Sequence, residues 1–77
     1  MKNAAAEYAK LQNQNAKLLT LIAAELKNHQ NRINTLTWGH CGDMQHSKQL
    51  MKELLTFLRN AYDEEKMHVQ IEAEIAE

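Results

Sequence analysis

Residues 37–43 read Thr-Trp-Gly-His-Cys-Gly-Asp and contain both glycines of a 77-residue chain that has no proline. A long segment without a comparable turn signal lies on each side of this stretch. Gly39 can adopt the left-handed conformation that ends a helix, and Asp43 is of a type that caps the next one. We therefore expect a turn at residues 37–43 between two long helices.

The segment before this turn has the apolar spacing of an amphipathic helix. Its apolar residues recur every three or four positions and fall within a stripe about 100° wide. They are Ala4, Tyr8, Leu11, Leu18, Leu19, Ile22, Leu26, Ile33 and Leu36. We predict one helix over residues 3–36. Its end stays open from Asn31 onward, because residues 34–38 favour extended backbone.

The segment after the turn predicts a second helix over residues 44–76. As far as Tyr62 its apolar residues cover roughly 160° of the helical wheel, enough to contact more than one neighbour. Beyond Tyr62 the stripe moves to Met67, Ile71 and Ile75, so a break or rotation near residue 63 stays open. Residues 67–75 also alternate with period two, as strands do, but the three glutamates and two alanines among residues 71–77 favour helix.

These two segments predict an all-α fold, a single antiparallel helical-hairpin domain over residues 1–77. Residues 1–38 carry five basic and two acidic groups, whereas residues 39–77 carry four basic and eight acidic groups. Antiparallel packing is expected to set the acidic residues of the C-terminal part beside Lys2, Lys10 and Lys17. Such exposed pairs mostly help to choose the orientation of the helices.

A lone hairpin of this size buries too little apolar surface, so we expect hairpins to associate into a helical bundle. A homodimer is favoured, although a trimer or a heteromer satisfies the same physics. The predicted core consists of Leu11, Leu18, Ile22, Leu26, Leu54, Leu55, Leu58 and Tyr62.

Two polar residues, Asn15 and His29, lie in the apolar seam of the first helix. A buried asparagine that must find a partner can fix the register and the oligomeric state. We therefore predict a register role for both residues. The alternative is that Asn15 lies at a wet helix end and that His29 bonds a neighbouring group.

The residues with metal-binding or nucleophilic side chains do not form a known pattern. His40, Cys41, Asp43 and His46 match no established zinc spacing, and Cys41 has no expected pocket around it. We expect no metal, no cofactor and no enzymatic activity, although the sequence leaves a metal on this cluster open. The single cysteine, and the lack of a signal peptide or a long apolar run, predict a cytoplasmic protein without membrane association.

Residues 34–40, Asn-Thr-Leu-Thr-Trp-Gly-His, are followed by Gly42-Asp43 and a leucine-rich helix. Over residues 33–59 the chain resembles small accessory proteins from the early region of lambda-like temperate bacteriophages. This resemblance contains no catalytic motif and implies no functional residues. It implies a non-enzymatic modulator of host physiology or of phage development.

The sequence as a whole predicts a non-enzymatic, oligomeric protein–protein interaction module whose partners are a second copy and a host or phage protein. The candidate contact residues are Trp38, His40, Leu50 and Phe57, with Trp38 alternatively closing the end of the helical core. A second hypothesis is a nucleic-acid-binding regulator that uses the first helix's lysine face (Lys2, Lys10, Lys17, Lys27). The net charge of −1 counts against it.

Overall fold

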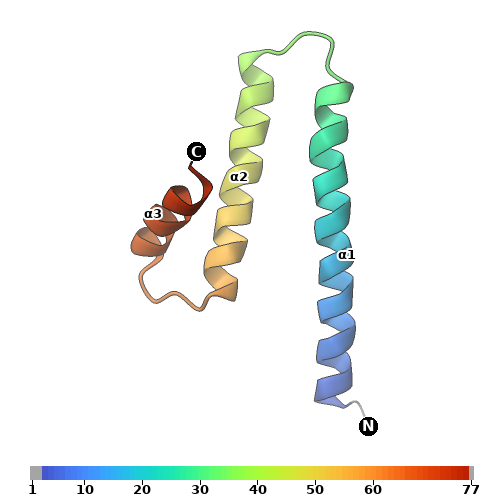
Figure 1. The fold of residues 1–77 in the computed structure, drawn as a ribbon, viewed down its shortest axis with the longest axis vertical. Coiled ribbons are helices and arrows are strands. Elements are labelled where there is room, and N and C mark those ends of the chain that lie inside the picture. Colours follow the sequence, from blue (N-terminus) through green and yellow to red (C-terminus); the bar gives the residue numbers. More distant parts are fainter. Residues whose placement is uncertain (1–2, 77) are drawn as a thin grey trace. The chain divides into compact units, whose positions relative to one another are not determined.

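Residues 3–76 are described by a computed structural model, and they form three helices without any strand (Figure 1). The helices are α1 (Ala4–Asn31), α2 (Trp38–Leu58) and α3 (Glu64–Ile75). The prediction of an all-α fold is therefore confirmed. The chain divides into two compact units, residues 1–35 with α1 and residues 36–77 with α2 and α3. Each unit is described by itself.

Helix α1 begins at a side-chain cap and ends earlier than its apolar pattern predicts. The Asn3 carboxamide oxygen accepts the amide hydrogen of Ala5 at 2.8 Å and that of Ala6 at 3.4 Å. The helix ends at Asn31, so Ile33 and Leu36 lie outside it. No residue of α1 is buried. Within its own unit, the apolar stripe of α1 is therefore not buried against other residues.

Helix α2 begins before the glycines, which corrects the prediction of a turn over residues 37–43. Thr37 has an extended backbone, and its hydroxyl accepts the amide hydrogen of His40 at 3.4 Å. The His40 ring nitrogen Nδ1 accepts the Thr37 amide hydrogen at 3.1 Å, completing a capping box in which histidine replaces the usual glutamate. Gly39 has no positive φ and Asp43 caps nothing, since both lie inside α2.

Helix α2 ends at a Schellman motif whose left-handed residue is Asn60, with a φ of 53°. The Asn60 amide donates to the Phe57 carbonyl at 3.1 Å, and the Ala61 amide donates to the Thr56 carbonyl at 3.4 Å. Glycine usually occupies this position, and asparagine is among the few other residues that tolerate it. The end of α2 therefore depends on a single asparagine.

Helix α3 starts at Glu64, after a loop of residues 59–63. The sequence left open a break near residue 63, and this loop is that break. The Asp63 carboxylate accepts the Lys66 amide hydrogen at 3.1 Å and so caps the first turn of α3. Glu64 and Glu65 follow in that turn, where negative charge interacts favourably with the helix dipole. The alternating pattern of residues 67–75 therefore forms helix rather than strand.

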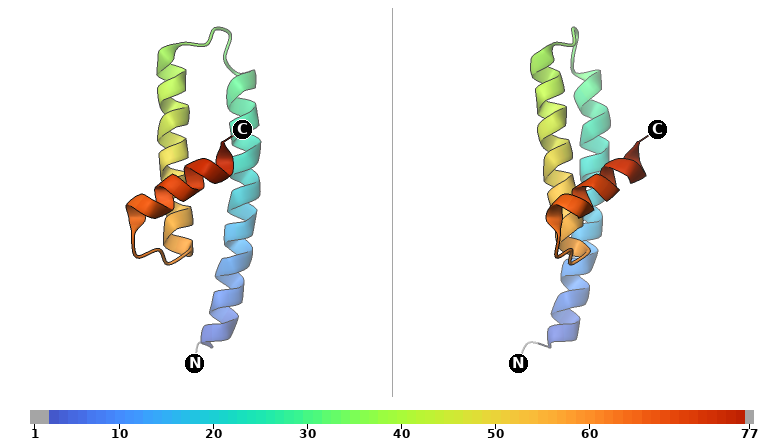
Figure 2. Two further views of the ribbon diagram at one scale, coloured as in Figure 1. Left: turned by 60° about the vertical axis from the view of Figure 1, so that its left-hand side comes forward. Right: turned by 90° about the vertical axis from the view of Figure 1, so that its left-hand side faces the viewer.

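Helix α3 folds back against α2, and the views in Figures 1 and 2 agree that it crosses the C-terminal half of that helix. Ile71 is 2% exposed and Thr56 is 6% exposed, and these are the two buried residues of the described chain. The Thr56 hydroxyl donates to the Lys52 carbonyl at 2.8 Å, so its burial leaves no unpaired polar group. The predicted shift of the apolar stripe to Met67, Ile71 and Ile75 gives α3 the face that it turns to α2.

The predicted core differs from the one that the chain forms. Tyr62 is fully exposed in the loop of residues 59–63, and Ile71, which was not predicted, is the buried apolar residue. Leu26 and Leu55 are half-buried. The other predicted core residues are exposed, namely Leu11, Leu18, Ile22, Leu54 and Leu58.

Replacement of Ile71 by alanine is expected to lower the free energy of unfolding of the α2–α3 unit by about 2 kcal/mol. This is the low end of the range for buried aliphatic residues, since the surrounding cavity is open to solvent on one side. Urea denaturation of the full chain, followed by circular dichroism at 222 nm, measures the change. Val69→Ala is the matched control, because Val69 is an exposed aliphatic residue of the same helix. Equal losses in the two variants would contradict this account of the packing.

Candidate interaction surfaces

The first candidate surface is the apolar seam of α1, which we define as Tyr8, Leu11, Asn15, Leu18 and Ile22. The spacing alternates between three and four residues, which places all five side chains on one side of a helix. All five are exposed. Exposed leucine and isoleucine in a continuous line mark a helix that packs against another one.

The two predicted register residues lie on the same side of α1. Asn15 is exposed in the middle of the seam, and His29 is half-buried one turn beyond Leu26. At about 100° per residue both point within about 40° of Ile22. The geometry places them where a partner helix would contact them, and their register role stays a prediction.

The second candidate surface is the outer face of α2, which we define as Leu50, Leu54, Phe57 and Leu58. All four side chains are exposed, Phe57 by 76%. Most of this face is turned away from Lys52 and Leu55, which contact α3, because successive residues turn by about 100°. Two of the predicted contact residues, Leu50 and Phe57, therefore share one apolar surface.

The other two predicted contact residues are placed differently. Trp38 is the first residue of α2 and is 89% exposed, so it does not close a core within this chain. It lies about three turns from Leu50 and on another side of the helix. The His40 ring belongs to the capping box of α2 and therefore has a structural role that the sequence did not predict.

A charged surface joins α3 to α2, and it replaces the predicted pairing of the acidic residues with Lys2, Lys10 and Lys17. The Glu72 carboxylate lies 2.9 Å from the ammonium groups of both Lys48 and Lys52. The Arg59 guanidinium donates two hydrogen bonds to the Glu74 carboxylate, at 2.6 and 3.0 Å.

The predicted pairing was wrong for Glu72 and Glu74 because the chain reverses at residues 59–63. That reversal brings α3 back to the cations of α2. Among the other residues of the prediction, Lys2 and Glu77 lie outside the described residues.

These contacts shift the ionisation of the acidic groups. Hydrogen bonds from Lys48 and from Lys52 hold the pKa of Glu72 below its ordinary value. The hydrogen bond from Arg59 likewise lowers the pKa of Glu74, and the same bond raises the pKa of Arg59. The charged forms of the carboxylates therefore favour the docked state of α3.

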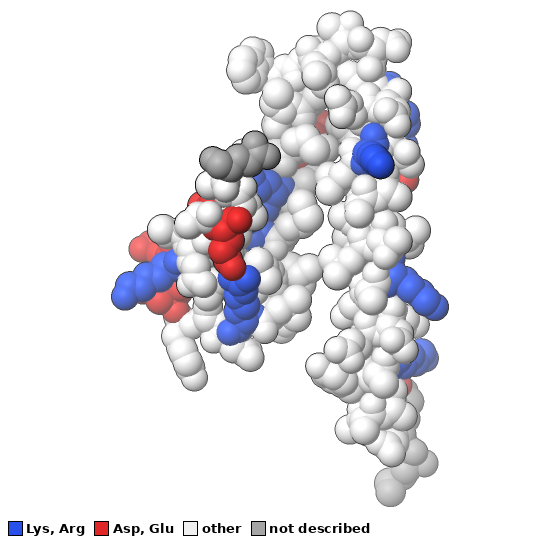
Figure 3. Space-filling view, in the orientation of Figure 1, with Lys and Arg blue, Asp and Glu red and all other residues white. Residues whose placement is uncertain are grey.

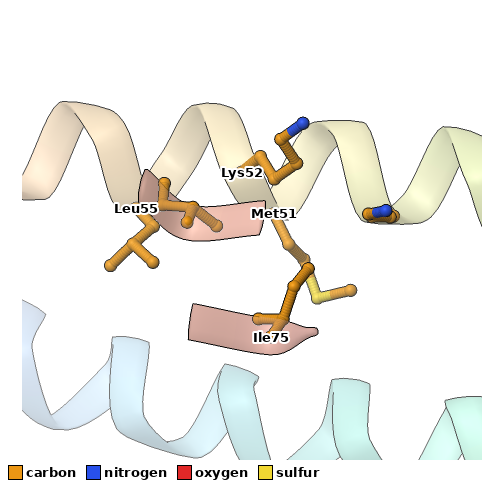
Figure 4. A pocket seen from close by; sticks show the side chains of 6 residues that line it. Met51, Lys52, Leu55 and Ile75 are labelled. Carbon is orange, nitrogen blue, oxygen red and sulfur yellow. The ribbon is translucent and has the colours of Figure 1, made fainter. Parts of the chain in front are cut away.

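A small apolar groove of about 210 Å³ follows the junction of α2 and α3 (Figure 4). Met51 points toward Ile75 across it, whereas the ammonium group of Lys52 points away. Its lining consists of Lys48, Met51, Lys52, Leu55, Ile71 and Ile75. The lining is apolar apart from Lys48 and Lys52, whose ammonium groups are paired with Glu72.

The residues singled out for metal or thiol chemistry are not brought together. His40, Cys41, Asp43 and His46 all lie in the first three turns of α2, and Cys41 is exposed. Within residues 3–76 no three His, Cys, Asp or Glu side chains are arranged to hold a metal ion. Across the same residues, no helix is both long enough and apolar enough to cross a membrane.

Neither a protein-family model, nor a curated protein, nor a solved structure matches this chain. The function has to be argued from the residues and geometry of the chain itself.

The docking of α3 is expected to weaken in acid. A carboxylate whose pKa is lowered by folding contributes stability above its ordinary value of 4.5, and that stability is lost as the pH falls through the folded pKa. The free energy of unfolding should therefore fall from about pH 5 to about pH 3. Glu72→Gln, which cannot ionise, should be less stable than the wild type at pH 7 and should show a flatter acid limb.

Urea denaturation at a series of pH values, followed by circular dichroism, measures both effects. Glu53→Gln is the control, because Glu53 is exposed on α2 and hydrogen-bonds Gln49 of the same helix. An acid limb of equal slope in the wild type and in Glu72→Gln would show that the Glu72 pairs do not stabilise α3.

Proposed function

We propose that this protein is a non-enzymatic, oligomeric protein–protein interaction module. The observation that carries the proposal is the amount of apolar side chain left in water. Seventeen large apolar residues of residues 3–76 are exposed, and Ile71 is the buried one. A soluble monomer rarely leaves continuous apolar faces of this kind uncovered, because each buried methylene contributes about 0.8 kcal/mol.

The length of α1 adds a second argument for association. A helix of 28 residues without any buried residue gains little from tertiary packing, although in proteins most helical stability comes from the packing of an apolar face. Its seam has the three-and-four spacing that packs helix against helix. Contact with another helical surface therefore accounts for both the length of α1 and the position of its apolar residues.

We take the associating surfaces to be the seam of α1 and the outer face of α2, which in an antiparallel hairpin both contact the second copy. Two such hairpins then close into a four-helix bundle with twofold symmetry. The two faces are matched in chemistry, since leucine and isoleucine dominate one and leucine with phenylalanine the other. Asn15 places an amide in the middle of the α1 seam, and its need for a hydrogen-bond partner selects one alignment of the proposed bundle.

Contact with a further protein fits the residues that such a bundle leaves free. Trp38 is almost fully exposed at the start of α2, and tryptophan is enriched among residues that dominate binding energy. Its position beside a rigid capping box limits the entropy that binding would cost. A host regulator, as the phage resemblance implies, is our proposal for that partner.

The nucleic-acid hypothesis has less support. Lys48, Lys52 and Arg59 are paired with glutamates, and so is Arg32, which lies 3.0 Å from Glu25. On the face shown in Figure 3, the basic side chains along α1 are spaced apart rather than gathered in a continuous patch. A phosphate backbone requires several cations that act together.

Replacement of Ile22 by glutamine is expected to weaken self-association by about tenfold, because it places an amide in the middle of the apolar seam. Light scattering behind a sizing column, over a range of protein concentrations, gives the absolute mass. Leu21→Gln is the matched control, since Leu21 is of the same size and is also exposed, but lies about 100° away around α1. A wild-type mass of one chain at all concentrations would contradict the oligomer. Equal weakening by both variants would contradict the assignment of the seam.

A further inference from the structure

The surface between α2 and α3 has an unusual composition for a contact within one chain. Its apolar part is small, because Ile71 is the one large side chain that is buried there. Its charged part is comparatively large, with Lys48 and Lys52 on Glu72 and Arg59 on Glu74. Ion pairs that are partly open to solvent contribute specificity and orientation more than strength. The contact is therefore specific for its partner helix, but the free energy of docking is small.

The loop that lets α3 reach its own α2 is also weakly specified. Residues 59–63 read Arg-Asn-Ala-Tyr-Asp, without glycine or proline, and the reversal depends on Asn60 in the left-handed conformation. Asp63, with an extended backbone and a side chain that caps α3, is the second residue that holds the break. If Asn60 and Asp63 become helical, α2 and α3 join into one continuous helix and α3 leaves its own α2.

A detached α3 cannot remain alone. As a separate helix its 12 residues are too short to persist in water, and as the end of a continuous helix it exposes the apolar face that contains Ile71. It needs a surface with one apolar site for Ile71 and two cationic sites for Glu72 and Glu74. A second copy of the chain presents this surface on its own α2, with the same residues at the same spacing.

We infer that α3 is exchangeable between copies, docking on the α2 of a second chain when residues 59–63 straighten. On the second chain α3 meets the same residues that it leaves on its own, so the balance depends on the loop and on protein concentration, as in other domain-swapped dimers. This inference does not require the apolar seam of α1, and it supplies a second connection between copies. The partner's Glu72 then binds Lys48 and Lys52, and the partner's Glu74 binds Arg59.

Two charge-reversed variants test the exchange. The first carries Lys48→Glu, Lys52→Glu and Arg59→Glu, which makes α2 repel its own α3. The second carries Glu72→Lys and Glu74→Lys, which has the same effect from the side of α3. Neither variant can dock α3 within its own chain, but each provides the complement of the other. Mixing them should restore α3 docking in a heterodimer.

Hydrogen exchange at residues 67–75 reports the docking, and native mass spectrometry reports the composition of the dimers. Each variant alone should lose protection, and the equimolar mixture should regain it, with heterodimers about tenfold in excess of homodimers. A single chain with all five substitutions is the folding control and should be protected without a partner. A protected control together with an unprotected mixture would overturn the inference.

A second pair of variants separates exchange from general attraction between oppositely charged chains. It has the same charge changes at positions outside the ion pairs between α2 and α3, Lys10→Glu, Lys17→Glu and Lys27→Glu in one chain and Glu7→Lys and Glu53→Lys in the other. Protection of residues 67–75 should be normal in each of these variants alone and unchanged by mixing. Recovery driven by net charge alone would appear as the same heterodimer excess in both pairs and would also overturn the inference.

The loop gives an independent readout in the wild-type background. Asn60→Gly favours the reversal and should lower the fraction of exchanged dimer about fivefold, whereas Asn60→Ala favours the continuous helix and should raise it by a similar factor. If the chain fails to associate through the α1 seam but the charge-reversed pair exchanges, the proposed function fails and this inference holds. If the charge-reversed variants form homodimers and heterodimers through the seam in a statistical ratio, and α3 docking is not restored, the proposed function holds and this inference fails.

Discussion

The docking of Ile71 on α2 is the contact on which the tertiary structure of residues 36–77 depends. Burial of one isoleucine side chain is worth about 1.5–3 kcal/mol, a modest amount for a helix that is too short to persist alone. The other structural features of this junction position the Ile71 side chain against α2. Asp63 begins the helix, Asn60 reverses the chain before it, and Glu72 and Glu74 fix its orientation against the cations of α2.

Much of the helical content can be read from the sequence because apolar periodicity reports it directly. The seam of α1 and the shift of the stripe to Met67, Ile71 and Ile75 both follow from spacing alone. The helix boundaries cannot be obtained in the same way. Two glycines suggested a turn, yet Thr37 and His40 cap each other, so α2 starts at Trp38 and includes both glycines. A threonine–histidine box is a weaker signal than a glycine, and only the structure shows which one decides.

The candidate contact residues illustrate a different limit. Leu50 and Phe57 could be predicted to share a face, since they are seven residues apart on one helix. The placement of Trp38 on another side, and the use of His40 as a cap, depended on where α2 begins. The cations that bind α3 could not be found from spacing either, because Lys52 and Glu72 are brought together by the reversal at Asn60.

The two sides of α2 differ in chemistry, and this difference separates their responses to the environment. The outer face with Leu50 and Phe57 is apolar, so contacts made there are largely insensitive to salt and to pH. The side that holds α3 depends on Glu72 and Glu74, whose attraction to cations weakens when salt screens them or acid neutralises them. A change in ionic conditions therefore acts on α3 while the apolar association stays intact. In the bundle that we propose, copies of the chain are held close together, which raises the effective concentration at which one α3 meets the α2 of its neighbour. In that proposal, association through the apolar faces promotes exchange of α3 without any contact between the two surfaces.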